Sequence, residues 1–220
     1  RVGKKSPKKL YYRLLSEFML QQTQVKTVIP YFSTFIKKYK TLRALSKSDE
    51  KKILKLWEGL GYYRRARNLL ACSKLLVKNY KSKLPESISE IKKLPGVGDY
   101  TANALLGLIY DKPRIALDGN VRRVFSRYLG IIKLTKHNML KMKNFLYQLL
   151  LTTNSRMFNQ AIMEIGALVC TNYNPKCNNC PININCRAFL RKNPYLYPEK
   201  KIKKRKKTRH YFALILKSKD

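Results

Sequence analysis

The chain has 220 residues, of which 45% are hydrophobic, so it is long enough to bury a core and too apolar to be disordered. Its 48 Lys and Arg residues face 12 Asp and Glu residues, and the formal charge of +36 indicates a polyanionic partner, either nucleic acid or an anionic membrane surface. Part of this charge can also reflect AT-rich coding. The sequence shows no apolar run of about 18 residues that would span a bilayer and no signal-peptide pattern, so we expect a cytoplasmic protein.

Apolar residues recur at helical spacing along most of the chain. The spacing predicts helices at residues 10–20, 25–36, 48–60, 63–80, 87–94, 100–110, 121–129, 139–151 and 156–170. No alternating pattern of any length precedes residue 208, so we predict an all-α fold. The segment 200–209 is almost wholly basic, and 211–216 (YFALIL) is strand-like. Because a lone strand is not stable, we expect this strand to begin a further domain.

Polar residues at the starts of several predicted helices are candidate N-caps. We predict that Thr23, Ser48 and Asp99 cap the helices that follow them. The string Ser87-Ile88-Ser89-Glu90 matches a capping box. Each cap would accept a hydrogen bond from a backbone N–H that the first helical turn leaves free.

Four cysteines follow one another as C-x6-C-x2-C-x5-C, at Cys170, Cys177, Cys180 and Cys186. Four thiolates without histidine suit zinc or an iron–sulfur cluster. Zinc ribbons usually have two C-x2-C knuckles and this run has one, so the spacing favours a [4Fe–4S] cluster. Buried or oxidised cysteines are the alternative, but nothing indicates an oxidising compartment. The fifth cysteine, Cys72, lies in a helical pattern and is predicted to be a core residue.

A glycine-rich string, Leu94-Pro95-Gly96-Val97-Gly98, joins two predicted helices. Its two glycines allow the backbone to turn sharply and to approach another molecule closely. The hairpin amides and the N-terminus of the next helix would face an anion, which in so basic a chain we expect to be a DNA phosphate. The string is typical of a helix-hairpin-helix, and an ordinary helix–turn–helix is the alternative.

Two carboxylates stand out among the few acidic residues. Asp118 follows Gly98 by twenty residues and could simply cap the next helix. Because a carboxylate repels phosphates, however, an acidic residue in a DNA-binding protein is expected to have a function. Glu17 lies in an apolar neighbourhood, which should raise its pKa and keep it protonated. One carboxylic acid and one carboxylate are the groups that glycosidic and N-glycosidic hydrolysis use.

Together these features resemble the helix-hairpin-helix DNA glycosylases, and among them the MutY family of adenine DNA glycosylases. The resemblance runs from about residue 10 to residue 198. The strings that carry it are SEFMLQQTQV (16–25), GLGYY (59–63), LPGVG (94–98), LDGNV (117–121) and FNQA (158–161).

The resemblance implies an all-α fold of two helical lobes with the active-site cleft between them. A six-helix barrel with the helix-hairpin-helix would take residues 16–118, and an iron–sulfur lobe would take 1–15 together with 119–190. A basic linker (191–207) and the start of a truncated Nudix-like domain (208–220) would follow. The family also has an N-terminal helix and a Leu-Pro-Trp stretch that would precede residue 1.

The resemblance also implies a reaction. The enzyme would hydrolyse the N-glycosidic bond of adenine mispaired with 8-oxoguanine or guanine, after flipping the base into a pocket. Glu17 would protonate N7 of the adenine, and Asp118 would stabilise the oxocarbenium-like sugar, which can include a covalent intermediate. Tyr100 and Asn120 would support the two carboxylates.

Further residues are implied to contact the DNA. Gln160 would contact the edge of the adenine. Gln22 and Tyr62 would be wedged into the duplex where the base left, although Tyr62 and Tyr63 could equally be core aromatics. The hairpin residues at the DNA backbone would be Gly96, Val97 and Gly98. The partner would be double-stranded DNA with A·8-oxoguanine or A·G mismatches, bound by a monomer associated with the bacterial nucleoid.

Position 100 separates the close relatives. Endonuclease III-like bifunctional enzymes resemble this chain, cluster included, but carry a nucleophilic lysine where this chain has Tyr100, so we expect base removal without efficient strand cleavage. A thymine glycosylase for G·T mismatches can also carry tyrosine there and is the main alternative within the fold, although the QQTQ and LDGN strings favour the adenine enzyme. A non-catalytic iron–sulfur DNA-binding or redox module is the alternative of another class, but it would gain from replacing Glu17 and Asp118.

Overall fold

The structure, a computed structural model, describes residues 7–199. Residues 200–207 of the predicted basic linker, the strand-like segment 211–216 and the predicted start of a Nudix-like domain at 208–220 lie outside the described residues. Within residues 7–199 every regular element is helical, which confirms the all-α prediction for this part of the chain.

The described part of the chain consists of α-helices joined by short loops. They are α1 (Pro7–Leu20), α2 (Val25–Lys38), α3 (Leu42–Ser46), α4 (Glu50–Trp57), α5 (Arg64–Asn79), α6 (Ile88–Ile91), α7 (Asp99–Tyr110), α8 (Gly119–Leu129), α9 (Lys136–Leu150), α10 (Ser155–Glu164) and α11 (Arg187–Leu190). A π-helical turn (Ile165–Val169) continues α10, and two 3-10 turns lie at Cys177–Asn179 and Pro194–Leu196. The helical spacing missed α3 and α11, because helices of one turn show no periodicity.

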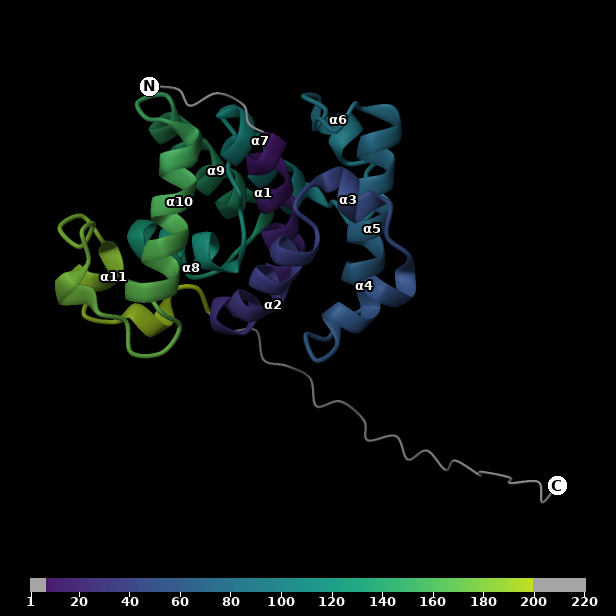
Figure 1. Ribbon diagram of the computed structural model, residues 1–220. Coiled ribbons are helices and arrows are strands. Elements are labelled where there is room, and N and C mark those ends of the chain that lie inside the picture. The colour runs from purple at the N-terminus through teal and green to yellow at the C-terminus, as the bar shows by residue number, and fades with distance from the viewer. Residues whose placement is uncertain (1–6, 200–220) are drawn as a thin grey trace, which may run out of the picture.

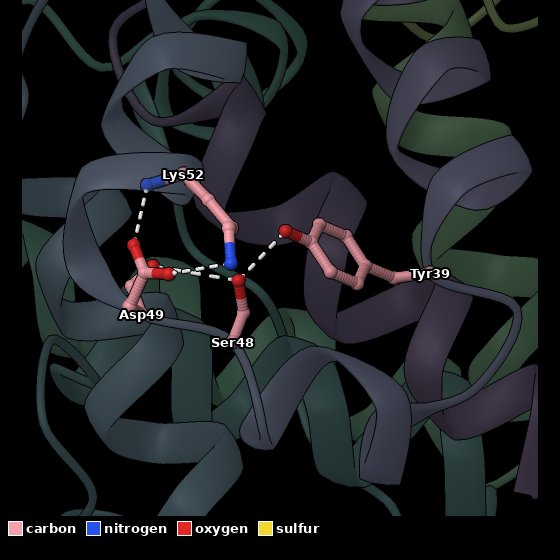
Figure 2. A network of polar contacts seen from close by, with 4 residues as sticks. All are labelled: Tyr39, Ser48, Asp49 and Lys52. Atoms are coloured by element: carbon pink, nitrogen blue, oxygen red, sulfur yellow. Dashed lines mark hydrogen bonds and ion pairs between the residues drawn. The ribbon is translucent and has the colours of Figure 1, made fainter.

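The start of α4 corrects one predicted cap. Asp49, and not Ser48, is the N-cap, since its Oδ1 accepts the backbone N–H of Lys52 at 2.8 Å. The Lys52 ammonium lies 3.0 Å from the other carboxylate oxygen, and the Ser48 hydroxyl lies 2.7 Å from the hydroxyl of Tyr39 (Figure 2). A carboxylate suits the positive end of the helix dipole better than a hydroxyl, so Ser48 is free to tie the end of α2 to α4.

Two other predicted caps are also wrong. Gln24, rather than Thr23, precedes α2, and its side chain makes no capping hydrogen bond. Gly98 is the N-cap of α7, while Asp99 occupies the first helical position and pairs with Lys92 at 2.6 Å. The amides at the start of α7 are therefore left without a side-chain cap.

The capping box predicted before α6 does not form. Ser87 does stand at the N-cap position, but its hydroxyl lies 2.7 Å from the hydroxyl of Ser89 and caps no backbone amide. The helix that follows has only four residues, Ile88–Ile91, and so it ends before residue 94, where the spacing placed its end.

Two large clusters of buried apolar residues divide the helices, and a small third one joins Ala104 and Leu108 of α7 to Ala116. The first draws on α1 to α7 and includes Trp57, whose ring meets Phe35 edge-on at 5.8 Å. The second draws on α8, α9 and α10 and includes Phe125, which packs against Phe145 and Phe158. Figure 1 shows α3 to α6 on one side, α8, α10 and α11 on the other, and α1 and α2 between them. Because α7 contacts both α1 and α10, it links the two clusters.

The predicted lobe boundaries stay a prediction, but the packing of α1 bears on one of them. Leu10, Tyr11, Leu14 and Leu15 are all buried in the first cluster. The part of α1 that was assigned to the iron–sulfur lobe therefore packs with α2, α5 and α7, as the rest of this helix does.

Candidate active site

The string 94–98 forms a tight hairpin between α6 and α7, which confirms the predicted helix-hairpin-helix. Gly96 has a φ of +75°, and a Cβ there would lie 2.7 Å from both Phe18 and Asn68. The hairpin is therefore pressed against α1 and α5 at Gly96. A Cβ at Gly98 would instead meet nothing within 4 Å, and Gly98 is exposed. The two glycines thus have different tasks, one in packing and one at the surface.

Val97, between the two glycines, points into the protein. Its side chain is 6% exposed, and its N–H donates to the carbonyl of Leu94 at 3.1 Å. The side chain of Val97 therefore anchors the hairpin, and only the backbone of this residue is placed for contact with another molecule.

Glu17 lies near the C-terminal end of α1 and is 8% exposed. Burial, the largest cause, raises the pKa of Glu17 from 4.5 to about 7; nearby Arg13 lowers it and Asp118 adds a smaller increase. The raised pKa expected from the apolar neighbourhood is confirmed. A substantial share of Glu17 is therefore protonated at neutral pH and able to donate a proton.

Asp118 stands at the N-terminus of α8. One carboxylate oxygen accepts the backbone N–H of Val121 at 2.7 Å, and the other accepts the side-chain amide of Asn120 at 3.2 Å. The capping alternative is thus correct. The carboxylate has a second effect as well, because it also raises the pKa values of Glu17 and Tyr100. Asp118 is both a cap and a member of an acidic cluster.

Tyr100 lies in the first turn of α7, directly after the hairpin. Burial, followed by the charges of Glu17 and Asp118, raises the pKa of Tyr100 above its ordinary value of 10. Its hydroxyl therefore stays protonated. Because these electrostatic effects act at short range, the structure brings Glu17 from α1, Tyr100 from α7 and Asp118 from α8 to one place.

The segment that leads to Asp118 is held by a side chain that the sequence reasoning missed. Asn159 on α10 is 2% exposed. Its Oδ1 accepts the N–H of Ala116 at 2.8 Å, and its Nδ2 donates to the carbonyl of Arg114 at 2.7 Å. An extended segment without a strand partner thus has its hydrogen bonds satisfied by α10. The sequence did offer one signal for this role, a side-chain amide on the buried face of an amphipathic helix.

Arg123 is a second residue that was missed. It donates to Asn120 Oδ1 at 2.9 Å, to the carbonyl of Gly166 at 2.7 Å and to the carbonyl of Cys170 at 2.9 Å. It thereby joins the partner of Asp118 to the first of the four cysteines. Its i, i+3 spacing from Asn120 on α8 could have predicted their contact, because such residues are neighbours on a helix surface.

The four cysteines surround one small cavity. Cys170, Cys177, Cys180 and Cys186 all line it, and Arg127 donates to the Sγ of Cys170 at 3.3 Å. Within residues 7–199, no three His, Cys, Asp or Glu side chains are arranged to hold a single metal ion. Four convergent thiols next to a guanidinium are a donor set that fits an iron–sulfur cluster.

Cys72 and the thiols around the cavity differ in their surroundings. Cys72 is fully buried in the first cluster, as predicted. Burial raises the pKa of Cys177, and Cys170 and Cys186 raise it further, because thiolates so close together repel one another. Such a set of thiols is better accommodated when a metal group takes their charge.

Gln22 and Tyr62 are both exposed and both have left-handed backbones, with φ of 60° and 49°. Non-glycine residues adopt this conformation when the surrounding structure imposes it. Tyr62 is 60% exposed and Tyr63 41%, so the core-aromatic alternative is wrong. Gln160 is exposed on α10 and donates to Glu164 of the same helix at 3.2 Å; within residues 7–199 no hydrogen bond joins it to the acidic cluster.

Across the part of the chain that the structure describes, no helix is both long enough and apolar enough to cross a membrane.

Sequence comparisons match the same residues to known proteins. The model of the HhH-GPD superfamily base excision DNA repair proteins matches residues 15–146. A curated protein named adenine DNA glycosylase from Buchnera aphidicola subsp. Schizaphis graminum is 45% identical over 202 residues, which cover 91% of this chain and 58% of that protein. The mouse adenine DNA glycosylase is 38% identical over 84% of this chain and 37% of its own length. The chain thus spans about three fifths of this Buchnera relative.

Solved structures show the same fold. A thermostable thymine-DNA glycosylase superimposes with a TM-score of 0.72 at 26% identity, over 85% of this chain and 87% of that chain. A trapped endonuclease III–DNA covalent intermediate gives a TM-score of 0.69 at 23% identity, over 84% and 86%. The family match covers more than half of the chain and includes Glu17, the hairpin and Asp118. The chain belongs to the HhH-GPD superfamily of base excision DNA repair proteins.

Proposed function

We propose that the chain is a monofunctional DNA glycosylase, which hydrolyses the N-glycosidic bond of adenine mispaired with 8-oxoguanine or guanine. The observation that carries the proposal is the acidic cluster, in which the buried Glu17 has a pKa of about 7 and lies near the partly buried Tyr100 and Asp118. The matches to proteins named adenine DNA glycosylase, which cover most of this chain, support adenine as the base.

In the proposed reaction the two carboxyl groups have different roles: one donates a proton and the other stabilises a positive charge. Glu17, protonated because it is buried, donates its proton to N7 of the adenine, so that the base leaves as a neutral molecule. The Asp118 side chain stabilises the oxocarbenium-like sugar. Its hydrogen bonds to Asn120 and Val121 fix its orientation. Water then adds to the sugar carbon, its proton passes to the Glu17 carboxylate, and an abasic site is left.

The proposed DNA contacts come from three loops and from α10. The exposed backbone at Gly96 and Gly98 would bind phosphate oxygens next to the N-terminus of α7. Gln22 and Tyr62, exposed and held in left-handed conformations, would enter the gap left by the flipped adenine. Gln160 would exchange its hydrogen bond to Glu164 for one to the adenine edge.

We further propose that a [4Fe–4S] cluster is held by the four cysteine thiolates, with Arg127 next to Cys170. Its contribution would be structural: a metal group bound by four thiolates holds together a loop that has little regular structure of its own. No step of base removal passes through it. The exposed Lys176 and Arg187, beside Cys177 and Cys186, would then be presented to phosphates.

A thymine glycosylase for mismatches remains the second candidate, because the thymine-DNA glycosylase superimposes on most of this chain. The experiment that separates the candidates uses four duplexes, with A·8-oxoguanine, A·G, T·G and A·T pairs at one position. Each is incubated with the protein and split into two portions, one heated in alkali and one not.

We expect alkali-dependent breaks in the A·8-oxoguanine and A·G duplexes and intact strands without alkali. Breaks confined to the T·G duplex would show that the chain is a thymine glycosylase instead. Strand cleavage without alkali, as fast as base loss, would contradict a monofunctional enzyme. No break in any duplex would contradict glycosylase activity of this chain.

A further inference from the structure

Arg65 is a buried cation that none of the steps above uses. It lies in the first turn of α5 and is only 6% exposed. Burial lowers its pKa, and no carboxylate is among the partners that the described residues give it. A buried charge without a counter-ion is costly, so its retention calls for an explanation.

The guanidinium of Arg65 bonds backbone carbonyls of two separate segments. One nitrogen donates to Phe18 at 3.3 Å, to Met19 at 2.6 Å and to Gln21. The other donates to Leu60 at 3.3 Å and to Gly61 at 3.1 Å. The Arg65 guanidinium thus joins the C-terminal end of α1 to the loop between α4 and α5, two segments about forty residues apart in sequence.

Three physical effects offset the cost of burying this charge. The carbonyls at the end of α1 carry the negative end of the helix dipole, and α1 has no basic residue of its own in its last turn. The guanidinium also lies 5.5 Å from the centre of the Trp57 ring and 5.2 Å from that of Tyr62. A planar fork is needed to reach both segments at once, and only arginine supplies one.

The positions of the acceptors explain what this clamp does. The Gln21 carbonyl immediately precedes Gln22, and the Gly61 carbonyl immediately precedes Tyr62. Gln22 and Tyr62 are the two non-glycine residues with left-handed backbones in these loops. Arg65 therefore fixes the peptide just before each strained residue, and strained conformations persist only where such contacts over-determine them.

We infer that Arg65 is a positioning residue that couples the Gln22 loop to the Tyr62 loop, so that both side chains are set for insertion into the duplex at the same time. The inference rests on the proposed function, because it assigns these two loops to mismatch probing. Arg65 itself is too buried to touch DNA. Its contacts with Phe18 and Met19 also hold the end of the helix that carries Glu17.

The test compares Arg65→Lys with Arg156→Lys. Lysine keeps the charge but cannot fork to both loops. Arg156 is a matched control, because it also crosses between helices to bond carbonyls at a helix end, those of Leu108 at 2.8 Å and Ile109 at 3.3 Å on α7. It lies on α10, away from both loops. If the role of Arg65 were only structural, the two variants would behave alike.

Three quantities are measured for each variant. The first is amide hydrogen exchange in the two loops. The second is the ratio of affinities for a duplex with an uncleavable adenine analogue opposite 8-oxoguanine and for an undamaged duplex. The third is the salt dependence of binding to undamaged DNA.

For Arg65→Lys we expect faster amide hydrogen exchange in both the Gln22 loop and the Tyr62 loop. The affinity ratio and single-turnover base release should fall by about 10-fold to 100-fold, the range that small misplacement produces. The salt slope should not change, because Arg65 contacts no phosphate; loss of one phosphate contact would reduce it by about 0.9. Arg156→Lys should lower thermal stability without changing the affinity ratio.

A second variant keeps the inference testable if Arg65→Lys does not fold. Gly61→Ala adds a Cβ that meets nothing within 4 Å, but the φ of +74° strains its backbone and displaces the Gly61 carbonyl. Faster exchange should then reach the Gln22 loop, although the substitution is in the other loop. Exchange confined to residues 59–63, or an unchanged affinity ratio in Arg65→Lys, would overturn the inference. A wild-type protein that releases no base would contradict the proposed function instead, whereas the exchange result tests the clamp by itself.

Discussion

The carboxyl group of Glu17 makes the stability of the protein depend on pH. Its pKa is raised from 4.5 to about 7 by burial, so the folded state binds its proton more tightly than the unfolded state does. The stabilising contribution is complete below about pH 4.5 and is lost as the pH rises through about 7. Glu17→Gln, which is neutral throughout, should gain up to about 3 kcal/mol in unfolding free energy over wild type across this window.

Denaturant unfolding of both proteins at several pH values measures this difference. Glu58→Gln is a suitable control, because Glu58 is exposed and pairs with Lys55 at the surface. The prediction fails if the difference between wild type and Glu17→Gln is the same at pH 4.5 and at pH 8.

In the proposed reaction, the residue at position 100 determines whether the strand is cut. The Tyr100 hydroxyl is a weak nucleophile because burial and two neighbouring carboxyl groups raise its pKa. Tyr100→Lys would place an amine near the sugar carbon that Asp118 faces in the proposed complex. We expect a borohydride-trappable protein–DNA adduct and some strand cleavage from this variant and neither from wild type. An equal yield of adduct from both proteins would show that Tyr100 does not lie at the sugar.

At the residue scale, the sequence predicts chemistry that is local and misses contacts that are distant. The raised pKa of Glu17 could be predicted because its apolar neighbours lie beside it in sequence. That Glu17, Tyr100 and Asp118 meet came from the family resemblance, not from any spacing. Arg65 and Asn159 were missed because they also bond segments more than forty residues away, and a buried arginine among carbonyls leaves no pattern in the sequence.

The hairpin between α6 and α7 allows packing and DNA contact to be tested separately. Gly96→Val should destabilise the protein strongly, because a left-handed residue with a Cβ costs about 1–2 kcal/mol and its Cβ would collide with Phe18 and Asn68. Gly98→Ala should fold normally, since its Cβ meets nothing, but bind DNA less tightly if phosphate approaches there.

Thermal unfolding and DNA affinity together check this pair of variants. A normal melting temperature for Gly96→Val would show that the hairpin can move away from α1 and α5. Unchanged affinity for Gly98→Ala would show that the exposed backbone of the hairpin is not a DNA contact.

The cysteine loop should depend on its metal group for its structure. Between Cys170 and Cys186 the structure contains only the 3-10 turn Cys177–Asn179 as a regular element, and the backbone hydrogen bonds of this loop close only local turns. Wild type should contain four iron atoms per chain. Cys180→Ser should lose iron and become sensitive to protease within this loop, while the first cluster stays folded.

Iron analysis and limited proteolysis measure both effects, with Cys72→Ser as the control that keeps its iron. Stoichiometric zinc without iron in wild type would contradict the proposed cluster.

At the element scale, the existence of long helices could be predicted and their ends could not. Apolar residues located α1, α2, α4, α5 and α7 to α10, because most of these helices bury one face and α7 is buried on nearly all sides. The N-caps at Ser48 and Asp99 were wrong because neighbouring residues compete for the same amides, and the outcome depends on partners such as Lys52 and Lys92. The predicted helix 156–170 includes the turn at Ile165–Val169, but its π-helical form was not predicted; there Gly166 lies close to Asn120.

For the whole molecule, the candidate site lies where the two apolar clusters meet. Glu17 belongs to a helix of the first cluster, Asp118 caps a helix of the second, and Tyr100 is on α7, which contacts both sides. Charge alone indicated only a polyanionic partner. The arrangement of the two clusters, which composition could not predict, is what brings an acid and a carboxylate together in so basic a chain.

Single-turnover release of free adenine from an A·8-oxoguanine duplex tests the central claim most directly, with wild type, Glu17→Gln and Asp118→Asn compared. Wild type should release adenine and leave an unbroken abasic strand. Both variants should bind the duplex at least as tightly but release adenine at least about 10²-fold more slowly, the usual loss for an acid–base group. Full activity in Glu17→Gln, or no adenine release by wild type, would contradict the account.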